Sequence, residues 1–224
     1  MTEQIAIIVD GQHINVKKGI NLVDALNQVG IDVPTLCYSN DQPCLGTCRV
    51  CTGKVNNRNM ALCTLNVEQG MDIKLNTDTL NDARKALVEL LFVEGNHFCP
   101  GCEKSGDCQL QSLAYQMRMS VSRFPYRFTP YDLDYRGQWL VLEHNRCIHC
   151  KRCTDLFRDD EGHQVFAFEG KGGQTVVKID LKREKKLTKE KAEEAVKLCP
   201  TGAILFKGRG FDRPYGKREF DHEK

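Results

Sequence analysis

The twelve cysteines of this 224-residue chain constrain it more than any other feature. They fall into three groups, within residues 37–63, 99–108 and 147–199. The N-terminus lacks the basic start, long apolar stretch and small-residue cleavage site of an export signal, which predicts a cytoplasmic protein. Clustered thiols in that reducing compartment bind metal more often than they form disulfides. We therefore expect one metal site for each group.

The third group has the most specific spacing. Cys147, Cys150 and Cys153 form C-x2-C-x2-C, and Cys199 follows much later, directly before Pro200. Such close spacing suits three corners of one cubane, and the proline fixes the turn that returns the fourth ligand. Because a zinc site is more usually built from two separated CxxC pairs, this group predicts a [4Fe–4S] cluster.

The first group contains five cysteines: Cys37, Cys44, Cys48, Cys51 and Cys63. Without Cys44 they read C-x10-C-x2-C-x11-C, whereas plant-type [2Fe–2S] ferredoxins use C-x4-C-x2-C and a distant fourth cysteine. A zinc site is the alternative on spacing alone. The hairpin and helix expected before this group favour a binuclear cluster, with Cys44 left as an unligated thiol beside it.

The middle group has only three cysteines, Cys99, Cys102 and Cys108, with His97 two residues before the first. Three thiolates alone would suit a three-iron cluster or an incomplete zinc site. Imidazole is a competent fourth ligand, and histidine replaces cysteine in Rieske centres. His97 is therefore a candidate ligand, and the alternative is a solvated or merely packed histidine.

The N-terminal region predicts a hairpin followed by a helix, which is how a β-grasp fold begins. The expected strands are Gln4–Val9 and Gln12–Val16, joined by an Asp10-Gly11 turn. Apolar spacing predicts a helix over 21–29, and 71–75 is expected to be a closing strand. The cysteines between residues 37 and 63 are expected to occupy the loops after this helix.

Two helices, over 80–94 and 108–119, flank the middle cysteines, and an ordered connector follows over 121–137. Residues from 138 onward predict half of a bacterial-type ferredoxin. Its expected strands are 139–143, 164–168, 175–180 and 203–206, and Thr188 is expected to cap a helix that ends near Leu198. The fold class is α+β, with domains at 1–78, 79–137 and 138–224.

Charge and motifs exclude several functions. The formal net charge of +2 gives no reason to expect a nucleic-acid partner, and no apolar run is long enough to span a membrane. No G-x-G-x-x-G motif follows a strand, so no dinucleotide site and no complete active site is expected on this chain. The basic, Gly-rich tail at 207–218 is either a docking strap or a mobile solvated tail.

Five motifs occur in order: CYSNDQPCLGTCRVC, GNHFCPGCEKSGDCQLQ, VSRFPYRF, RCIHCKRC and CPTGAI. Together they resemble the family of diaphorase small subunits of soluble NAD-reducing [NiFe] hydrogenases, over essentially the whole chain. The same modules resemble the N-terminal iron–sulfur region of the large complex I subunit and of [FeFe] hydrogenases.

The resemblance implies one [2Fe–2S] cluster and two [4Fe–4S] clusters. Their implied ligands are Cys37, Cys48, Cys51 and Cys63; His97, Cys99, Cys102 and Cys108; and Cys147, Cys150, Cys153 and Cys199. The complex I relatives place the ligand histidine four residues before the first cysteine of the middle group. Gly95 occupies that position here, and His97 is the expected ligand.

The resemblance also implies a function in electron transfer. The chain would relay single electrons between an FMN- and NAD-binding diaphorase subunit and a pair of [NiFe] hydrogenase subunits, so that FMN, NAD and the Ni–Fe centre lie on partners. The alternatives are the same relay in an NAD-dependent formate dehydrogenase or a complex I-like enzyme, and a non-redox zinc scaffold. A complex I subunit or an [FeFe] hydrogenase is expected to continue into a further domain beyond residue 224.

Overall fold

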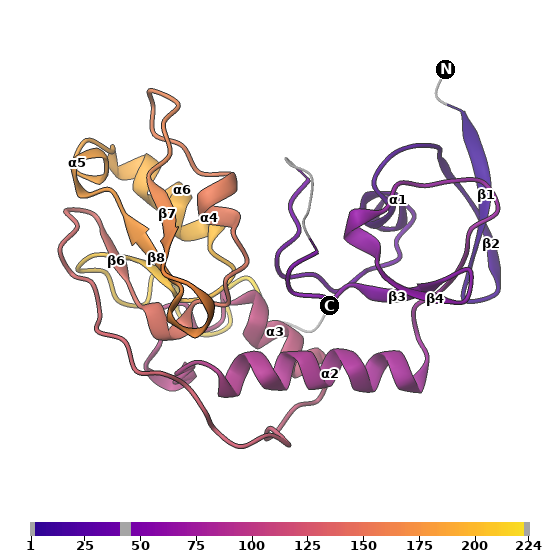
Figure 1. The fold of residues 1–224 in the computed structure, drawn as a ribbon, viewed down its shortest axis with the longest axis horizontal. Helices are drawn as coiled ribbons and strands as arrows, with labels where there is room; N and C mark the ends of the chain where they lie inside the picture. Colours follow the sequence, from indigo (N-terminus) through magenta and orange to yellow (C-terminus); the bar gives the residue numbers. More distant parts are fainter. Residues whose placement is uncertain (1–2, 41–45, 222–224) are drawn as a thin grey trace. The chain divides into compact units, whose positions relative to one another are not determined.

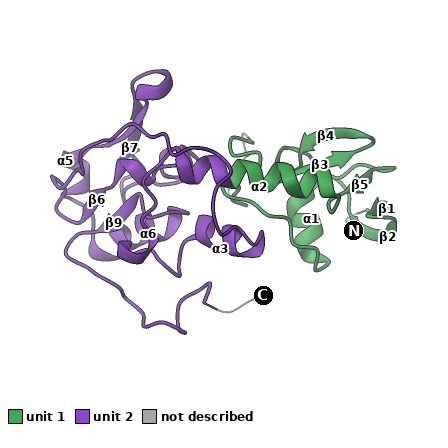
Figure 2. Ribbon diagram, turned by 90° about the horizontal axis from the view of Figure 1, so that it is seen from below, with its two compact units in different colours: residues 1–88 green, residues 89–224 purple. Residues whose placement is uncertain are grey.

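A computed structural model describes residues 3–40 and 46–221 of the chain (Figure 1). The chain forms two compact units, Met1–Val88 and Glu89–Lys224 (Figure 2). This division is coarser than the three expected domains, whose boundaries stay a prediction. Both units mix helices and strands.

A five-stranded mixed sheet forms the body of the first unit. The strands are β1 (Gln4–Val9), β2 (Gln12–Lys17), β3 (Thr52–Val55), β4 (Arg58–Ala61) and β5 (Asp72–Lys74), in the order β2-β1-β5-β3-β4. Strand β1 runs antiparallel to β2 and parallel to β5. Alternate residues of β1 (Ile5, Ile7 and Val9) are buried, as expected for a sheet with one covered face. The predicted hairpin and closing strand are therefore confirmed.

Helix α1 (Leu22–Gln28) contributes its apolar residues to the same core. The Asn21 side chain accepts a hydrogen bond from the Val23 amide, which caps the helix. Gly30 follows with a φ of 81°. This left-handed conformation suits glycine at a helix end, so the predicted helix is also confirmed.

The described cysteines of the first group lie in loops and turns, as expected, and a hairpin that was not expected separates Cys51 from Cys63. The hairpin of β3 and β4 lies within this stretch, and Asn56 and Asn57 form its turn with φ values of 46° and 67°. Asparagine tolerates this left-handed region, which two-residue hairpin turns require. The Asn-Asn pair is the sequence signal that could have identified this turn.

Helix α2 (Asp78–Val93) begins two residues earlier than predicted. The Thr77 hydroxyl accepts a hydrogen bond from the Leu80 amide at 3.2 Å and satisfies one free donor of the first turn. The 3-10 turn η2 (Cys99–Gly101) and helix α3 (Gln109–Gln116) follow. Helix α3 is shorter than the predicted 108–119, because Arg118 adopts a φ of 49° that ends the helix.

Two small antiparallel sheets and three helices form the second core. The sheets pair β6 (Leu140–Leu142) with β9 (Ile204–Phe206), and β7 (Phe166–Glu169) with β8 (Val176–Ile179). The helices are α4 (Arg152–Asp155), α5 (Leu181–Glu184) and α6 (Lys189–Leu198). Further 3-10 turns along the chain are η1 (Leu62–Thr64), η3 (His144–Arg146) and η4 (Gly172–Gln174).

The predicted Thr188 cap is confirmed, because its hydroxyl accepts a hydrogen bond from the Lys191 amide at 3.2 Å. All four predicted strands of this region are present, with ends that differ by at most two residues. The connector over 121–137 contains no helix or multi-residue strand, as expected. Within the described residues, no helix combines the length and apolar character needed to cross a bilayer.

Candidate iron–sulfur cluster sites

The four cysteines of the third group line one apolar cavity. Cys147 follows η3, Cys150 lies in the next loop, Cys153 belongs to α4 and Cys199 caps the C-terminus of α6. Side chains that include Leu142, Phe168 and Ile204 complete the wall. The fold thus brings together residues that are far apart in the sequence of the second unit.

Backbone amides in this loop point at the sulfur atoms. His149 and Lys151 have φ values of 51° and 67°, and this repeated left-handed conformation winds the loop tightly. Hydrogen bonds from the backbone of His149 and Arg152 lower the thiol pKa values of Cys147 and Cys150, respectively. Such amide–sulfur contacts are what a cluster nest requires.

Burial dominates the acidity of these thiols. It raises the pKa of Cys147 to about 12, and it also raises the pKa values of Cys150 and Cys153. Without a cation the thiols are therefore protonated, because an isolated thiolate is costly in an apolar cavity. Bound iron would supply the compensating charge, so binding releases protons and contributes to folding.

The middle group also lines one cavity, and His97 is part of its wall. The cavity is bounded by His97, Cys99, Cys102 and Cys108, together with Phe92, Arg146 and Gly202. Cys108 is the N-cap of α3, and the backbone of Leu110 and Gln111 in the first turn acts to lower the pKa of its thiol. Burial outweighs this effect and raises the pKa of Cys108 to about 12.

The imidazole of His97 is held neutral. Burial, and next the positive charge of Arg146, lower the pKa of His97 to about 4. The ring packs against Phe92 at a centroid distance of 5.3 Å and hydrogen-bonds to the backbone of Leu91. A neutral, oriented imidazole is the form that ligates metal.

Residue 95, where the complex I relatives have their ligand histidine, has no room for a side chain in this chain. A Cβ atom at Gly95 would lie 2.8 Å from Nε2 of His97 and 2.5 Å from the carbonyl oxygen of Asn145. The His97 ring therefore occupies the space that a side chain at residue 95 would fill. The histidine therefore stands two residues later than in the complex I relatives, and its imidazole still lines the cavity of the middle cysteines.

The first group forms two sulfur contacts. The amide of Cys48 donates to Sγ of Cys37 at 3.5 Å, and the Sγ atoms of Cys51 and Cys63 are 3.1 Å apart. The second distance is too long for a disulfide, whose S–S bond is about 2.0 Å. Strand register explains this approach, because Thr52 pairs with Ala61 and so carries Cys51 towards Cys63.

The pKa values of the Cys48 and Cys51 thiols depend on their contacts with the neighbouring cysteines. The contact with Cys37, followed by burial, raises the pKa of Cys48, whereas the side-chain contact with Cys63 lowers the pKa of Cys51. The charges of Cys48 and Cys37 also act on Cys51, so all four sulfurs form one electrostatic group. Arg84 of α2 lies nearby and donates to the Thr52 carbonyl at 2.9 Å.

The chain is similar to known proteins over nearly its whole length. It is 45% identical to the NAD-reducing hydrogenase HoxS subunit gamma of Cupriavidus necator, over 97% of this chain and 93% of that protein. The chain belongs to the HoxS gamma-subunit family. A crystal structure of an NAD⁺-reducing [NiFe]-hydrogenase in the H2-reduced state contains a chain that matches with a TM-score of 0.87 and 35% identity. The match covers 97% of this chain and 94% of that chain.

Three family models match successive parts of this chain. They describe a 2Fe-2S iron-sulfur cluster binding domain (residues 2–78), the NADH-ubiquinone oxidoreductase-G iron-sulfur binding region (84–123) and the NADH-quinone oxidoreductase subunit 3 ferredoxin-like domain (137–205). The chain is also 31% identical to the NADH-ubiquinone oxidoreductase 75 kDa subunit of Reclinomonas americana, of which it spans 30%. These matches show that the chain is an iron–sulfur electron-relay subunit of the kind found in NAD-reducing hydrogenases, which are oxidoreductases.

The structure places all twelve predicted ligands among the described residues and gathers them in the three expected sets. The middle and third cavities fit a cluster, because each joins buried sulfurs to backbone donors. Each site's exact ligand set stays a prediction. Cys44 lies outside the described residues, so its expected role as an unligated thiol also stays a prediction.

Several residues around the middle site were missed from the sequence. Gly202 is one, since a Cβ atom there would lie 2.7 Å from Sγ of Cys102. Arg146 is another, with its side chain in the wall of the cavity. Both belong to motifs of the third cysteine group, so no local pattern could connect them to the middle one.

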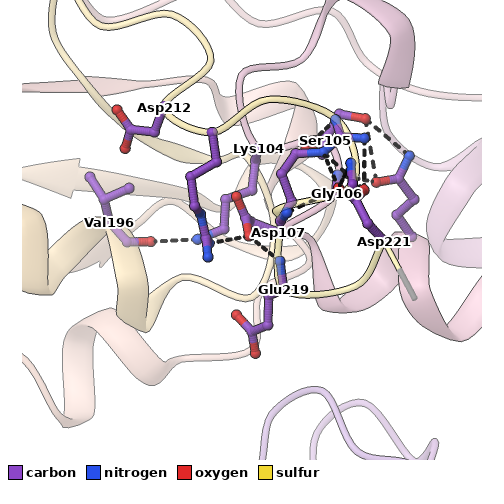
Figure 3. A network of polar contacts seen from close by, with 12 residues as sticks. Lys104, Ser105, Gly106, Asp107, Val196, Asp212, Glu219 and Asp221 are labelled. Carbon is purple, nitrogen blue, oxygen red and sulfur yellow. Dashed lines mark hydrogen bonds and ion pairs between the residues drawn. The ribbon is translucent and has the colours of Figure 1, made fainter. Parts of the chain in front are cut away.

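The C-terminal segment (residues 210–221) packs against the loop between Cys102 and Cys108 (Figure 3). The Asp107 carboxylate accepts from the Glu219 amide at 2.9 Å and pairs with Arg213. The Phe220 amide donates to the Gly106 carbonyl at 2.9 Å. These contacts hold the segment against its own chain, so it is not a freely solvated tail, and a docking role for residues 207–218 stays a prediction.

Proposed function

We propose that the chain holds one [2Fe–2S] cluster and two [4Fe–4S] clusters and passes single electrons among them. The proposed ligand sets are Cys37, Cys48, Cys51 and Cys63; His97, Cys99, Cys102 and Cys108; and Cys147, Cys150, Cys153 and Cys199. The observation that carries this proposal is the convergence of four cysteines on one cavity and of three cysteines with a neutral imidazole on another.

The proposed organisation is a β-grasp domain at 1–78, a helical domain with its connector at 79–137, and a ferredoxin-like domain at 138–224. The mixed sheet with a covering helix supports the first domain. The paired strands around the Cys147–Cys153 loop support the third.

The protein's own residues set the redox properties in this proposal. Bound clusters supply the one-electron chemistry. The chain holds the thiolates and the imidazole, donates amides to sulfur and excludes water, and these factors determine reduction potential. The proposed ligands bind clusters, and the catalytic conversions of NAD and hydrogen are proposed to occur on partners.

The proposed partners are an FMN- and NAD-binding diaphorase subunit and the two subunits of a [NiFe] hydrogenase. Electrons from NADH would reach the clusters one at a time after the flavin, and the reverse flow would reduce NAD⁺ with hydrogen. Support comes from the gamma-subunit relative, which is named as part of an NAD-reducing hydrogenase. Neither nucleic acid nor a membrane is among the proposed partners.

Metal analysis tests the cluster assignment. Anaerobically purified full-length chain is expected to contain about ten iron atoms, with matching acid-labile sulfide and visible absorption. Several zinc atoms and a colourless protein would contradict the proposal and favour a zinc scaffold.

Co-purification tests the assembly. The tagged chain, expressed in its native host, is expected to recover a complex that reduces NAD⁺ with hydrogen. A specific alternative is a complex I-like assembly, because the chain is 31% identical to part of a 75 kDa subunit. Recovery of complex I-like partners without hydrogen-dependent activity would favour that alternative.

A further inference from the structure

Arg146 lies where the middle and third sites of the second unit adjoin. It is the last residue of η3 and directly precedes Cys147. Its backbone carbonyl accepts from the Thr201 hydroxyl at 2.8 Å, and that hydroxyl is 3.7 Å from Sγ of Cys199. Its side chain turns the other way and lines the middle cavity, so one residue connects the two sites.

The guanidinium of Arg146 is only partly paired. Nη1 donates to Oε2 of Glu103 at 3.2 Å, and the Arg146 side chain is only 14% exposed. Nε is fully buried and has no acceptor among residues 3–40 and 46–221. Leaving a buried donor unpaired destabilises the fold, and more so for a charged group, so such a donor indicates an acceptor that is not a protein atom.

Gly202 leaves space beside the Arg146 stem and a cysteine sulfur of the middle site. A Cβ atom at Gly202 would lie 2.7 Å from Sγ of Cys102 and 3.3 Å from Cδ of Arg146. A side chain at residue 202 would therefore fill the space beside both the sulfur and the arginine stem. The Nε donor next to that stem is buried in the wall of the same cavity.

The positive charge of Arg146 lies beside the ligands of the middle site. Arg146 lines the same cavity as His97, Cys99 and Cys102. Arg146 is not among the residues that line the cavity of Cys147, Cys150 and Cys153. The charge is thus directed at the middle site, although the backbone of Arg146 adjoins the third.

We propose that Arg146 donates its buried Nε–H to a sulfur of the middle cluster and raises the reduction potential of that cluster. This inference rests on the proposed middle cluster. Reduction adds one electron to the cluster core and makes it more negative, while no covalent bond forms or breaks. A hydrogen bond and a positive charge stabilise that reduced form, whereas the Glu103 carboxylate opposes the effect.

The test is a redox titration of the full-length chain, followed by electron paramagnetic resonance. Arg146→Met removes the donor and the charge, and it is expected to shift the reduction equilibrium of the middle cluster at least tenfold towards oxidation. For one electron a tenfold shift is about 59 mV. Glu103→Gln is expected to shift the same equilibrium in the opposite direction, and Arg146→Lys to restore part of the wild-type value because it keeps the charge.

Arg152→Met is the matched control. Arg152 lines the third cavity, and its charge lowers the pKa of Cys150. This variant is expected to shift the third cluster and leave the middle one unchanged.

The results separate this inference from the proposed function. A wild-type chain that lacks the middle cluster by iron content would overturn both. A middle cluster whose potential is the same in wild type and Arg146→Met would overturn only the inference. If Arg146→Met fails to assemble, Glu103→Gln decides, and an unchanged or lowered potential in that variant would reject the role of Arg146.

Discussion

At the residue scale, the thiols of the third set are buried in apolar surroundings, so their thiolate forms need a bound metal to be stable. Cys199 is 7% exposed, and Cys147 has a pKa raised to about 12 by burial. Serine can fill the same space, but its alkoxide is a far poorer iron ligand than a thiolate. Loss of one sulfur ligand is therefore expected to damage the cluster of its own set and spare the others.

Replacing Cys199 with serine is expected to remove the third cluster or convert it to a three-iron form. The binuclear signal should persist, since its ligands lie in the other unit. Electron paramagnetic resonance of the reduced and oxidised chain checks this result. Cys44→Ala is the comparison and should leave all three signals intact; loss of the binuclear signal in that variant would make Cys44 a ligand.

His97→Ala is expected to perturb the spectrum of the middle cluster, because it removes the only imidazole in the wall of that cavity among the described residues. His97→Cys supplies a thiolate instead and is expected to retain a four-iron cluster at lower potential. The measurement is the same spectroscopy with iron analysis. An unchanged spectrum in His97→Ala would mean that another group is the fourth ligand.

The buried carboxylate of Glu184 organises the start of β6. Its oxygens accept hydrogen bonds from the backbone amides of Gln138, Trp139 and Leu140 at 2.8, 2.6 and 2.9 Å. Glu184→Gln places an amide group against these donors and is expected to lower the free energy of unfolding by about 2 kcal/mol.

Urea denaturation followed by fluorescence of Trp139, the single tryptophan, measures this effect. Exposed Glu190 in the first turn of α6 supplies the control, and Glu190→Gln should change stability by less than about 0.5 kcal/mol. Equal stability of the two variants would show that the amide contacts of Glu184 do not stabilise the fold.

At the element scale, the C-terminal strap over 210–221 covers the loop between Cys102 and Cys108. Besides the bonds to Asp107 and Gly106, Nη1 of Arg218 donates to the Ser105 carbonyl at 3.0 Å. Lys104 is held separately through its Nζ, which donates to the Val196 carbonyl of α6 at 3.0 Å. The loop therefore has two anchors, and only one of them depends on the strap.

Truncation after Arg209 is expected to speed iron loss from the middle cluster severalfold, because the loop loses its outer cover. Iron release to a chelator, resolved by the spectrum of each cluster, measures this effect. Lys217→Gln changes an exposed charge within the strap and should release iron at the wild-type rate. Equal acceleration at the third cluster would indicate general unfolding instead.

At the scale of the whole molecule, the two units have different dependence on metal. The first has an apolar core of strands and α1 that includes Ile7, Leu22, Leu26 and Ile73. In the second, the cluster ligands lie on short pieces such as η2 and the four-residue α4. Helices of that length are not stable alone in water, so they need the metal to fix them.

Removal of iron is therefore expected to unfold the ligand loops of the second unit first. Hydrogen exchange of the apo chain should keep β1 and β2 protected while residues 147–153 exchange freely. The holo chain is the reference. A fully protected second unit in the apo chain would show that metal does not contribute to its folding.

The sequence by itself determined the three cysteine sets, the leading hairpin and helix, and the capped helix before Cys199. These depend on local spacing, period and capping, which nearby residues specify. Only the tertiary structure decided that the register of β3 and β4 carries Cys51 towards Cys63. It also decided that Arg146 and Gly202 from the third set form a wall of the middle cavity. Contacts between distant segments depend on packing in three dimensions, and a linear spacing pattern does not record them.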